Sequence, residues 1–235
     1  TIKIDSENSL LNLIKKIAYR DSIGDLLAEG TKIASESIGK DSKNYAMHVK
    51  GLEIPSYDPR NLPALSLALS VSTKGACHNR ASAYDIDFNN KEIFNDPTII
   101  ASKTKSSEDY SAILDSMIWC KFLRKSFNNF YEETSEIYSL ITGVKYDSEK
   151  LKKAGERINN IKKLFNIQNG WMRSDDNLPE RLLNSKNQIM SHSFLDSMID
   201  SYYHFRGWDK NGNIPISKLS ELNLNTKDYA SKNTL

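Results

Sequence analysis

The chain has 235 residues, of which 26 % are charged and 39 % hydrophobic, the balance of a globular protein with one large or two small domains. Its 32 basic and 30 acidic side chains give a formal charge of +2, and no Lys/Arg block is dense enough to indicate nucleic-acid binding. No stretch reaches the roughly 18 apolar residues of a membrane helix, and the N-terminus has no signal-peptide core. Since two cysteines are too few for a disulfide framework, we expect a cytoplasmic protein with reduced thiols and neither nucleic-acid nor membrane partners.

The N-terminal region has the periodicity of helices. Apolar residues recur at helical spacing from Leu10 to Ile17, behind the polar start Asp5-Ser6. They recur again from Leu26 to Ile38, where Gly39 can end a second helix. We therefore predict that the first forty or so residues are helical.

The composition changes at residues 46–63, AMHVKGLEIPSYDPRNLP, which contain three prolines and one glycine. This composition favours an extended or looped segment, so we place a domain boundary near residue 45 and treat 1–45 and 46–235 as separate units. The short apolar run Leu65–Val71 leads into STKGACHNRASAYDID. The small residues around Gly75 in that segment suit a backbone that passes close to another group.

Helices are also predicted for most of the second half, and almost no strand alternation is present, so the expected fold class is mainly α. The expected helices are one opened by Ser107 that reaches Ile118, one over Phe130–Ile141, one capped by Asp147 over Leu151–Phe165, and one over residues 193–208 that stops at Gly207. Residues 170–183 contain several helix breakers and predict a loop, and the tail after residue 221 is expected to be loose.

Cys120 lies in the apolar stretch DSMIWCKF, five residues after Asp115. A lone cysteine in such a stretch is most often a small buried hydrophobe. A carboxylate on a buried helix face is costly unless donors bind it, so Asp115 either has a partner or faces solvent. On a regular helix the two side chains point about 140° apart, and they can address one ligand only if the helix ends or bends between them.

A second candidate is the segment GACHNRA, with His78 and Arg80 two positions apart and Lys74 just before them. Arginine offers a fixed fork of donors and histidine a proton, so the pair can bind an anionic or carbonyl group. The adjacent Cys77 does not make a zinc site, because no second ligand pair follows at zinc spacing. No glycine-rich phosphate loop, G-x-S-x-G elbow or C-x-x-C pair is present in the sequence. The remaining histidines are His48, His192 and His204, in different predicted elements.

Seven ordered segments resemble the C-terminal part of the aldehyde:ferredoxin oxidoreductase family, over nearly the whole chain. They are GDLLAEG (24–30), HVKGLEIPSYDPR (48–60), GACHNR (75–80), DSMIWCKF (115–122), AGERINNIKKLFN (154–166), DDNLPERLL (175–183) and YYHFRGWDKNG (202–212). The resemblance implies an irregular multi-helix fold, with residues 1–45 as the end of the family's second domain and 46–235 as its third. We therefore expect the chain to be a C-terminal piece of a longer polypeptide.

Full-length members of this family carry tungsten, held by two pterin dithiolenes, and a nearby [4Fe–4S] cluster. They oxidise aldehydes to carboxylic acids and pass the electrons to ferredoxin. The resemblance thus implies a tungsten or molybdenum bis-pterin, the cluster, ferredoxin, an aldehyde and the N-terminal domains of the same enzyme as partners, and it leaves a homo-oligomer open. By itself the chain is expected to be inactive. The alternatives are a non-catalytic helical scaffold or subunit, and a related tungstoenzyme that reduces acids or aromatic thioesters.

The resemblance also implies roles for single residues. The family's D-x-x-G-L-C motif matches Asp115 to Cys120, so Asp115 would hydrogen-bond a pterin, Trp119 would border it, and Cys120 would supply the one cluster thiolate that is remote in sequence from the other three. Ile118 stands where the family has glycine and Trp119 where it has leucine. These two departures leave open how the backbone bends between Asp115 and Cys120.

His78 and Arg80 match the family's histidine near the metal and the basic residue two positions later that helps to hold pterin. His78 would then donate or accept a proton, or hydrogen-bond the substrate carbonyl. His48 and Lys50 have the same spacing and are the second choice for these roles. We expect the preferred residues to face the same surface as the cysteine motif.

Overall fold

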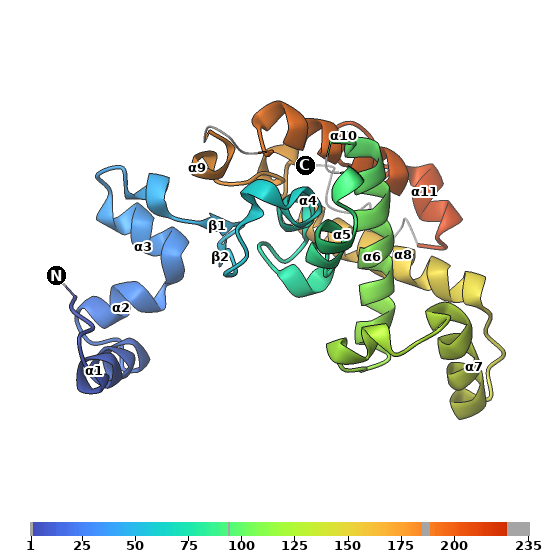
Figure 1. Ribbon diagram of the computed structural model, residues 1–235, viewed down its shortest axis with the longest axis horizontal. Coiled ribbons are helices and arrows are strands. Elements are labelled where there is room, and N and C mark those ends of the chain that lie inside the picture. Colours follow the sequence, from blue (N-terminus) through green and yellow to red (C-terminus); the bar gives the residue numbers. More distant parts are fainter. Residues whose placement is uncertain (1, 94, 185–188, 225–235) are drawn as a thin grey trace.

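The computed structural model describes residues 2–93, 95–184 and 189–224, and it confirms a mainly α fold. Figure 1 shows α1 to α3 at one end of the molecule and α7 at the other, with the remaining helices packed between them. The expected loose tail falls mostly on residues 225–235, which lie outside the described residues. Within the described residues, no helix is long and apolar enough to cross a membrane.

The N-terminal helices confirm the predicted periodicity. They are α1 (Glu7–Ala18), α2 (Ile23–Ala28), α3 (Gly30–Ile38) and the 3-10 turn η1 (Ser42–Tyr45). Ser6 caps α1 and Gly39, at φ +63°, ends α3. The second predicted helix is split in two, because Gly30 takes φ +79° between α2 and α3. None of the apolar side chains of α1 is buried, so this end of the molecule contributes little to the core.

The segment after Tyr45 is looped, as predicted, and contains a small hairpin. Strands β1 (His48–Val49) and β2 (Leu52–Glu53) pair antiparallel around Lys50 and Gly51, both with positive φ, as in the tightest hairpin turns. A 3-10 turn, η2 (Pro59–Asn61), follows. The apolar run then forms α4 (Pro63–Val71), in which every residue is buried.

Three helices form the body of the fold: α6 (Pro97–Ser116), α8 (Ser148–Gln168) and α10 (His192–Arg206). The ends of α8 and α10 agree with prediction, since Asp147 caps the first and Gly207, in the left-handed region, ends the second. The start predicted for α6 was wrong. The helix begins earlier because Asp96 accepts the N–H groups of the first turn behind Pro97, while the Ser107 hydroxyl donates to the Ala81 carbonyl instead.

The remaining elements are short, apart from α7. They are η3 (His78–Arg80), α5 (Tyr84–Asn89), η4 (Lys91–Ile93), η5 (Lys121–Lys125), α7 (Phe130–Thr142), η6 (Arg173–Asp175), α9 (Glu180–Leu183) and α11 (Ile216–Glu221). The breaker-rich residues 170–183 thus form a loop with two single turns. On α7 the predicted apolar face is buried only at its start, because Phe130 is in the core while Leu140 and Ile141 are 78 % and 77 % exposed. Phe165 on α8 is also exposed.

The core between these helices is polar as well as apolar. Arg206 is fully buried and donates to Glu108 and Asp109 at 2.6 Å each, while the Tyr202 hydroxyl donates to Glu108 at 2.5 Å. Burial raises the pKa of Glu108, against the opposing charge of Arg206. The aromatic residues near Tyr202 therefore supply hydrogen bonds to this core as well as apolar packing.

A second buried cluster joins the hairpin to α8. Asp176 lies 2.8 Å from the Lys50 ammonium and 3.1 Å from that of Lys163, and it accepts the Tyr203 hydroxyl at 2.6 Å. Although burial acts in the opposite direction, the charges of the two lysines lower the pKa of Asp176. The Lys163 ammonium also lies 2.9 Å from the centre of the Trp171 ring, a cation–π contact.

Candidate functional site

The helix that carries Asp115 ends before Cys120. Trp119 N–H donates to the Leu114 carbonyl and Ile118 N–H to the Asp115 carbonyl, both at 3.1 Å, which is the bonding pattern of a Schellman helix end. Ile118 takes φ +57° at the position where such ends favour glycine. A left-handed conformation costs a non-glycine residue roughly 1–2 kcal/mol. The bend required for Asp115 and Cys120 to address one ligand is therefore present, although the residue at the bend is isoleucine.

Both side chains of the cysteine motif lie at the surface. Cys120 is exposed and free, so the interpretation of this cysteine as a buried hydrophobe was wrong. The Asp115 side chain is 36 % exposed and also has cationic partners, so it both reaches solvent and is paired. The bend exposes both because Ser116 ends the helix and the chain turns outward into η5. The expected surface location is confirmed, and the ligand role of Cys120 stays a prediction.

Cations from two segments meet at Asp115. Arg80 Nη1 lies 3.4 Å from one carboxylate oxygen, and Lys121 Nζ lies 2.8 Å from the other. Lys162 on α8 is close enough for the charges of Arg80 and Asp115 to act on it, and burial together with Arg80 lowers its pKa. The Asp115 carboxylate is thus paired with two cations, Arg80 and Lys121, which leaves a local surplus of positive charge. Such a surplus favours a ligand with anionic groups.

His78 lies at the start of η3, half-buried against two tyrosines. Its ring centre is 5.5 Å from that of Tyr57 and 6.0 Å from that of Tyr84. The two tyrosine rings stack on one another with centres 5.0 Å apart and planes only 4° from parallel. His78 therefore has an aromatic wall on one side, which limits the access of water to the imidazole from that side.

Gly75 fixes the approach of this segment to the hairpin. It takes φ +94°, and a side chain at this position would collide with the carbonyl oxygen of Val49. The expectation of a close backbone approach around Gly75 is thus confirmed. The segment that carries His78 and Arg80 rests directly on strand β1.

The second-choice pair is placed differently. The Lys50 ammonium is bound by Asp176 and donates to the Ser70 carbonyl, with only 14 % of its side chain exposed. His48 Nδ1 accepts the Gly51 N–H at 3.3 Å, and burial lowers the pKa of His48. The structure therefore brings Arg80, and not Lys50, to Asp115.

Trp119 anchors the bend. Its ring stacks on Phe127 with centres 4.7 Å apart and planes 9° from parallel, and it meets Phe130 edge-on. These rings belong to a small second core under the end of α6. The ring of Trp119 therefore holds the segment of Cys120 in place, and a contact with pterin stays a prediction.

Sequence reasoning missed several residues at this site. They are Tyr57, Tyr84, Lys121, Arg124 and Lys162. Tyr57, Lys121 and Lys162 lie within the family-like segments, where nothing marked them out from their neighbours, and Tyr84 and Arg124 lie outside those segments. In the part of the chain that the structure describes, no group of three or more His, Cys, Asp or Glu side chains could hold a metal ion.

A family model described as "Aldehyde ferredoxin oxidoreductase, domains 2 & 3" matches residues 1–224. The chain belongs to the aldehyde ferredoxin oxidoreductase family. The resemblance found in the sequence is therefore confirmed, and so is the assignment to the C-terminal helical domains. The division at residue 45 stays a prediction, since the match covers domains 2 and 3 together.

Curated relatives agree with this assignment. The tungsten-containing aldehyde ferredoxin oxidoreductase of Pyrococcus furiosus is 33 % identical over 220 residues, and that of Thermococcus kodakarensis is 31 % identical over 223 residues. In both comparisons 90 % of this chain and 36 % of the relative are covered, so the chain spans about a third of the relatives' length. An aliphatic sulfonate oxidoreductase, WOR-like subunit, of Pyrococcus furiosus is 25 % identical over 236 residues, covering 93 % of this chain and 35 % of the relative.

A solved structure has the same fold. The active-site complex BamBC of benzoyl coenzyme A reductase, solved with 1,5-dienoyl-CoA, superposes with a TM-score of 0.82 at 20 % identity. The likeness covers 100 % of this chain and 42 % of that one. At this identity the likeness concerns the fold alone.

Proposed function

We propose that the chain is the C-terminal part of a tungstopterin enzyme that oxidises aldehydes to carboxylic acids and passes electrons through a [4Fe–4S] cluster to ferredoxin. The observation that carries the proposal is the end of α6, where Asp115 contacts Arg80 and the chain then bends to expose Cys120. Family membership and the tungsten in the relatives' names support the same chemistry. In this proposal residues 1–45 complete the second domain and 46–235 form the third.

The residues at the bend have the chemistry needed to bind a metallopterin and an iron–sulfur cluster. A carboxylate accepts the N–H donors of a pterin, and a surface thiolate is the usual ligand of cluster iron. The surplus cations at Asp115 suit a cofactor with anionic groups. When bound, the metallopterin would supply the two-electron redox chemistry and the cluster the one-electron exit to ferredoxin.

In the proposed reaction an aldehyde and water give a carboxylic acid, two electrons and two protons. His78 is the residue that would take or hold a proton at the substrate, because one imidazole ring can both accept and donate a proton. Tyr57 and Tyr84 would exclude water from one side of that imidazole. Arg80 and Asp115 would hold the pterin, and Cys120 would ligate the cluster.

The decisive experiment is Cys120→Ala in the complete enzyme, with Cys77→Ala as the matched control. Loss of one thiolate should greatly reduce the iron content and electron transfer to ferredoxin, while helical circular dichroism is retained. Cys77 is half-buried and has no ligand role in the proposal, so its variant should keep wild-type iron. Equal iron in both variants would contradict the cluster assignment.

The same preparations test the alternatives. Wild-type enzyme that contains neither iron nor tungsten would favour a non-catalytic scaffold. Enzyme that contains both but reduces an acid or an aromatic thioester, without oxidising aldehydes, would favour the related tungstoenzyme. Metal content and substrate assays on one preparation therefore separate the three functions.

A further inference from the structure

Arg124 occupies the turn that follows Cys120 and makes contacts in several directions. Its Nε lies 2.8 Å from Asp85 Oδ2, and its Nη2 donates to the Tyr84 hydroxyl at 3.1 Å. Its Nη1 donates to the Lys121 carbonyl at 3.2 Å, while its own carbonyl accepts the Tyr110 hydroxyl at 2.8 Å. One side chain thus joins η5, directly after Cys120, to the first turn of α5.

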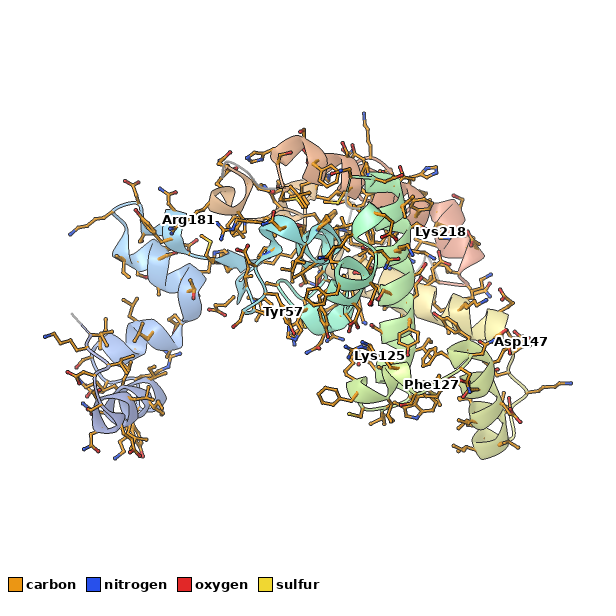
Figure 2. The ribbon with its side chains drawn as sticks, in the orientation of Figure 1. Tyr57, Lys125, Phe127, Asp147, Arg181 and Lys218 are labelled. Carbon is orange, nitrogen blue, oxygen red and sulfur yellow. The ribbon has the colours of Figure 1, made fainter. Side chains whose placement is uncertain are left out.

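The contact with Tyr84 continues to His78. The Arg124 guanidinium carbon lies 5.7 Å from the centre of the Tyr84 ring, and that ring stacks on Tyr57 and lies 6.0 Å from His78. A continuous series of direct contacts therefore runs from the turn after Cys120 to the imidazole. In Figure 2, Tyr57, Lys125 and Phe127 lie on the same lower side of the molecule, between the N-terminal helices and α7.

Burial makes this linkage stronger than a surface ion pair. The side chains of Arg124 and Asp85 are 17 % and 25 % exposed. Although burial acts the other way, the hydrogen bond and charge of Asp85 raise the pKa of Arg124. A half-buried guanidinium that holds a carboxylate and a phenol at once has a fixed geometry, which a lysine cannot reproduce.

Lys125 provides a natural comparison. It approaches the same carboxylate, with Nζ 3.5 Å from Asp85 Oδ1, but its side chain is 71 % exposed. Exposed pairs of this kind contribute little. Substitution of Lys125 therefore removes a neighbouring charge at Asp85 without touching the phenol of Tyr84.

We infer that Arg124 is a positioning residue, which ties the segment of Cys120 to the aromatic wall of His78 and so fixes the two relative to one another. The functional importance of the distance between Cys120, the proposed cluster ligand, and His78, the proposed proton acceptor, rests on the proposed function. The tie itself rests only on the contacts of Arg124. Reacting groups need placement to within fractions of an ångström, which gives such a tie a role in catalysis.

Hydrogen exchange of the full chain tests the tie without any cofactor. In Arg124→Met, backbone amides of residues 117–129 and of residues 78–89 should both exchange faster, by roughly tenfold, the factor for one lost charge-assisted hydrogen bond. Arg124→Lys should restore part of the protection, and Lys125→Met should change neither segment. Faster exchange in 117–129 alone, or in neither segment, would overturn the inference.

A second variant replaces Arg124→Met in this test if that protein does not fold, and a second measurement tests the effect on function. If Arg124→Met lacks a cooperative thermal transition, Asp85→Asn should show the same paired loss of protection, and its absence there overturns the tie.

In the cofactor-loaded enzyme, Arg124→Met should alter the electron paramagnetic resonance spectrum of the reduced cluster and lower kcat more than it raises KM, with Arg124→Lys between it and wild type. A spectrum and kcat equal to those of Lys125→Met would overturn the positioning role. Wild-type enzyme without a cluster would refute the proposed function, while the exchange result would still decide the tie.

Discussion

The carboxylates of Asp176 and Asp115 each meet two cations, and their surroundings differ. Asp176 has no exposed side-chain surface, and Lys50, Lys163, Tyr203 and Trp171 satisfy it from inside the body. Asp115 is 36 % exposed at the end of a helix, with Arg80 and Lys121 beside it. The first arrangement is complete and holds helices together, whereas the second still has a face open to a ligand. Similar ionic groups thus serve structure in one place and, in our proposal, cofactor binding in the other.

The largest expected effect is at the buried carboxylate. Asp176→Asn leaves two lysines in the interior without their counter-charge, so we expect a loss of about 3–5 kcal/mol in the free energy of unfolding. Urea denaturation followed by circular dichroism measures it. A loss no greater than that caused by Asp115→Asn would show that the two sites do not differ in this way.

A third carboxylate, Asp87, sharpens the comparison because it is held by backbone N–H groups. It accepts the N–H groups of Ala64 and Leu65 at 2.9 Å each, and burial raises its pKa to about 6. A carboxyl whose pKa is higher in the folded state binds more protons there, so its contribution to stability is present below pH ~4 and is lost as the pH rises through 6.

We therefore expect the difference in unfolding free energy between wild type and Asp87→Asn to shift by about 2–3 kcal/mol between pH 4 and 7, a span set by the two pKa values. Urea titrations at several pH values measure this difference. A constant difference over that range would place the titration of Asp87 outside it.

At Asp115 we expect a smaller effect on stability and a distinct effect on the cofactor. Asp115→Asn should change the free energy of unfolding by less than about 1 kcal/mol, because the ion pairs are partly exposed. In the complete enzyme the same change should lower pterin content by roughly tenfold, the effect of weakening a charge-assisted hydrogen bond. Pterin analysis beside urea denaturation measures both, and unchanged pterin content would contradict the proposed role.

The smallest expected effect is a gain. Ile118 is 92 % exposed at φ +57°, so Ile118→Gly removes backbone strain and loses almost no packing. The relief exceeds the added chain entropy of glycine by about 0.5 kcal/mol, and the melting temperature should rise slightly. Ile118→Ala is the control, since it keeps the strained conformation. A lower melting temperature for the glycine variant than for the alanine variant would refute this account of the bend.

Local signals predicted much of the fold. Caps such as Ser6 and Asp147 and the stop at Gly207 act within one turn, so sequence is sufficient to place them. The start of α6 was missed because Ser107 is an equally plausible cap by residue type, and its hydroxyl is used in a tertiary contact. The exposure of the apolar face of α7 depends on what covers that helix, and periodicity does not contain this information.

At the candidate site, the sequence predicted the chemistry of single residues better than it predicted which residues lie next to them. Family motifs singled out Asp115, Cys120, His78 and Arg80, and the contact between Arg80 and Asp115 joins two of these motifs. Lys121 and Lys162 lie in family-like segments but had no role assigned to them, and Arg124 lies outside those segments, so only the packing of the chain places these side chains at the site. Tertiary proximity of this kind cannot be deduced from spacing along one chain.

The small hairpin connects the buried cluster to the candidate site. Lys50 at its turn is bound by Asp176, and the neighbouring Val49 carbonyl is the surface on which Gly75 rests, three residues before His78. Lys50 and Val49 thus link the buried cluster to the segment that carries His78, and so help to fix where the imidazole lies. A substitution at Asp176 is therefore expected to move His78 as well as to weaken the fold, so that tolerance to mutation at this distant carboxylate is limited by the geometry of the site.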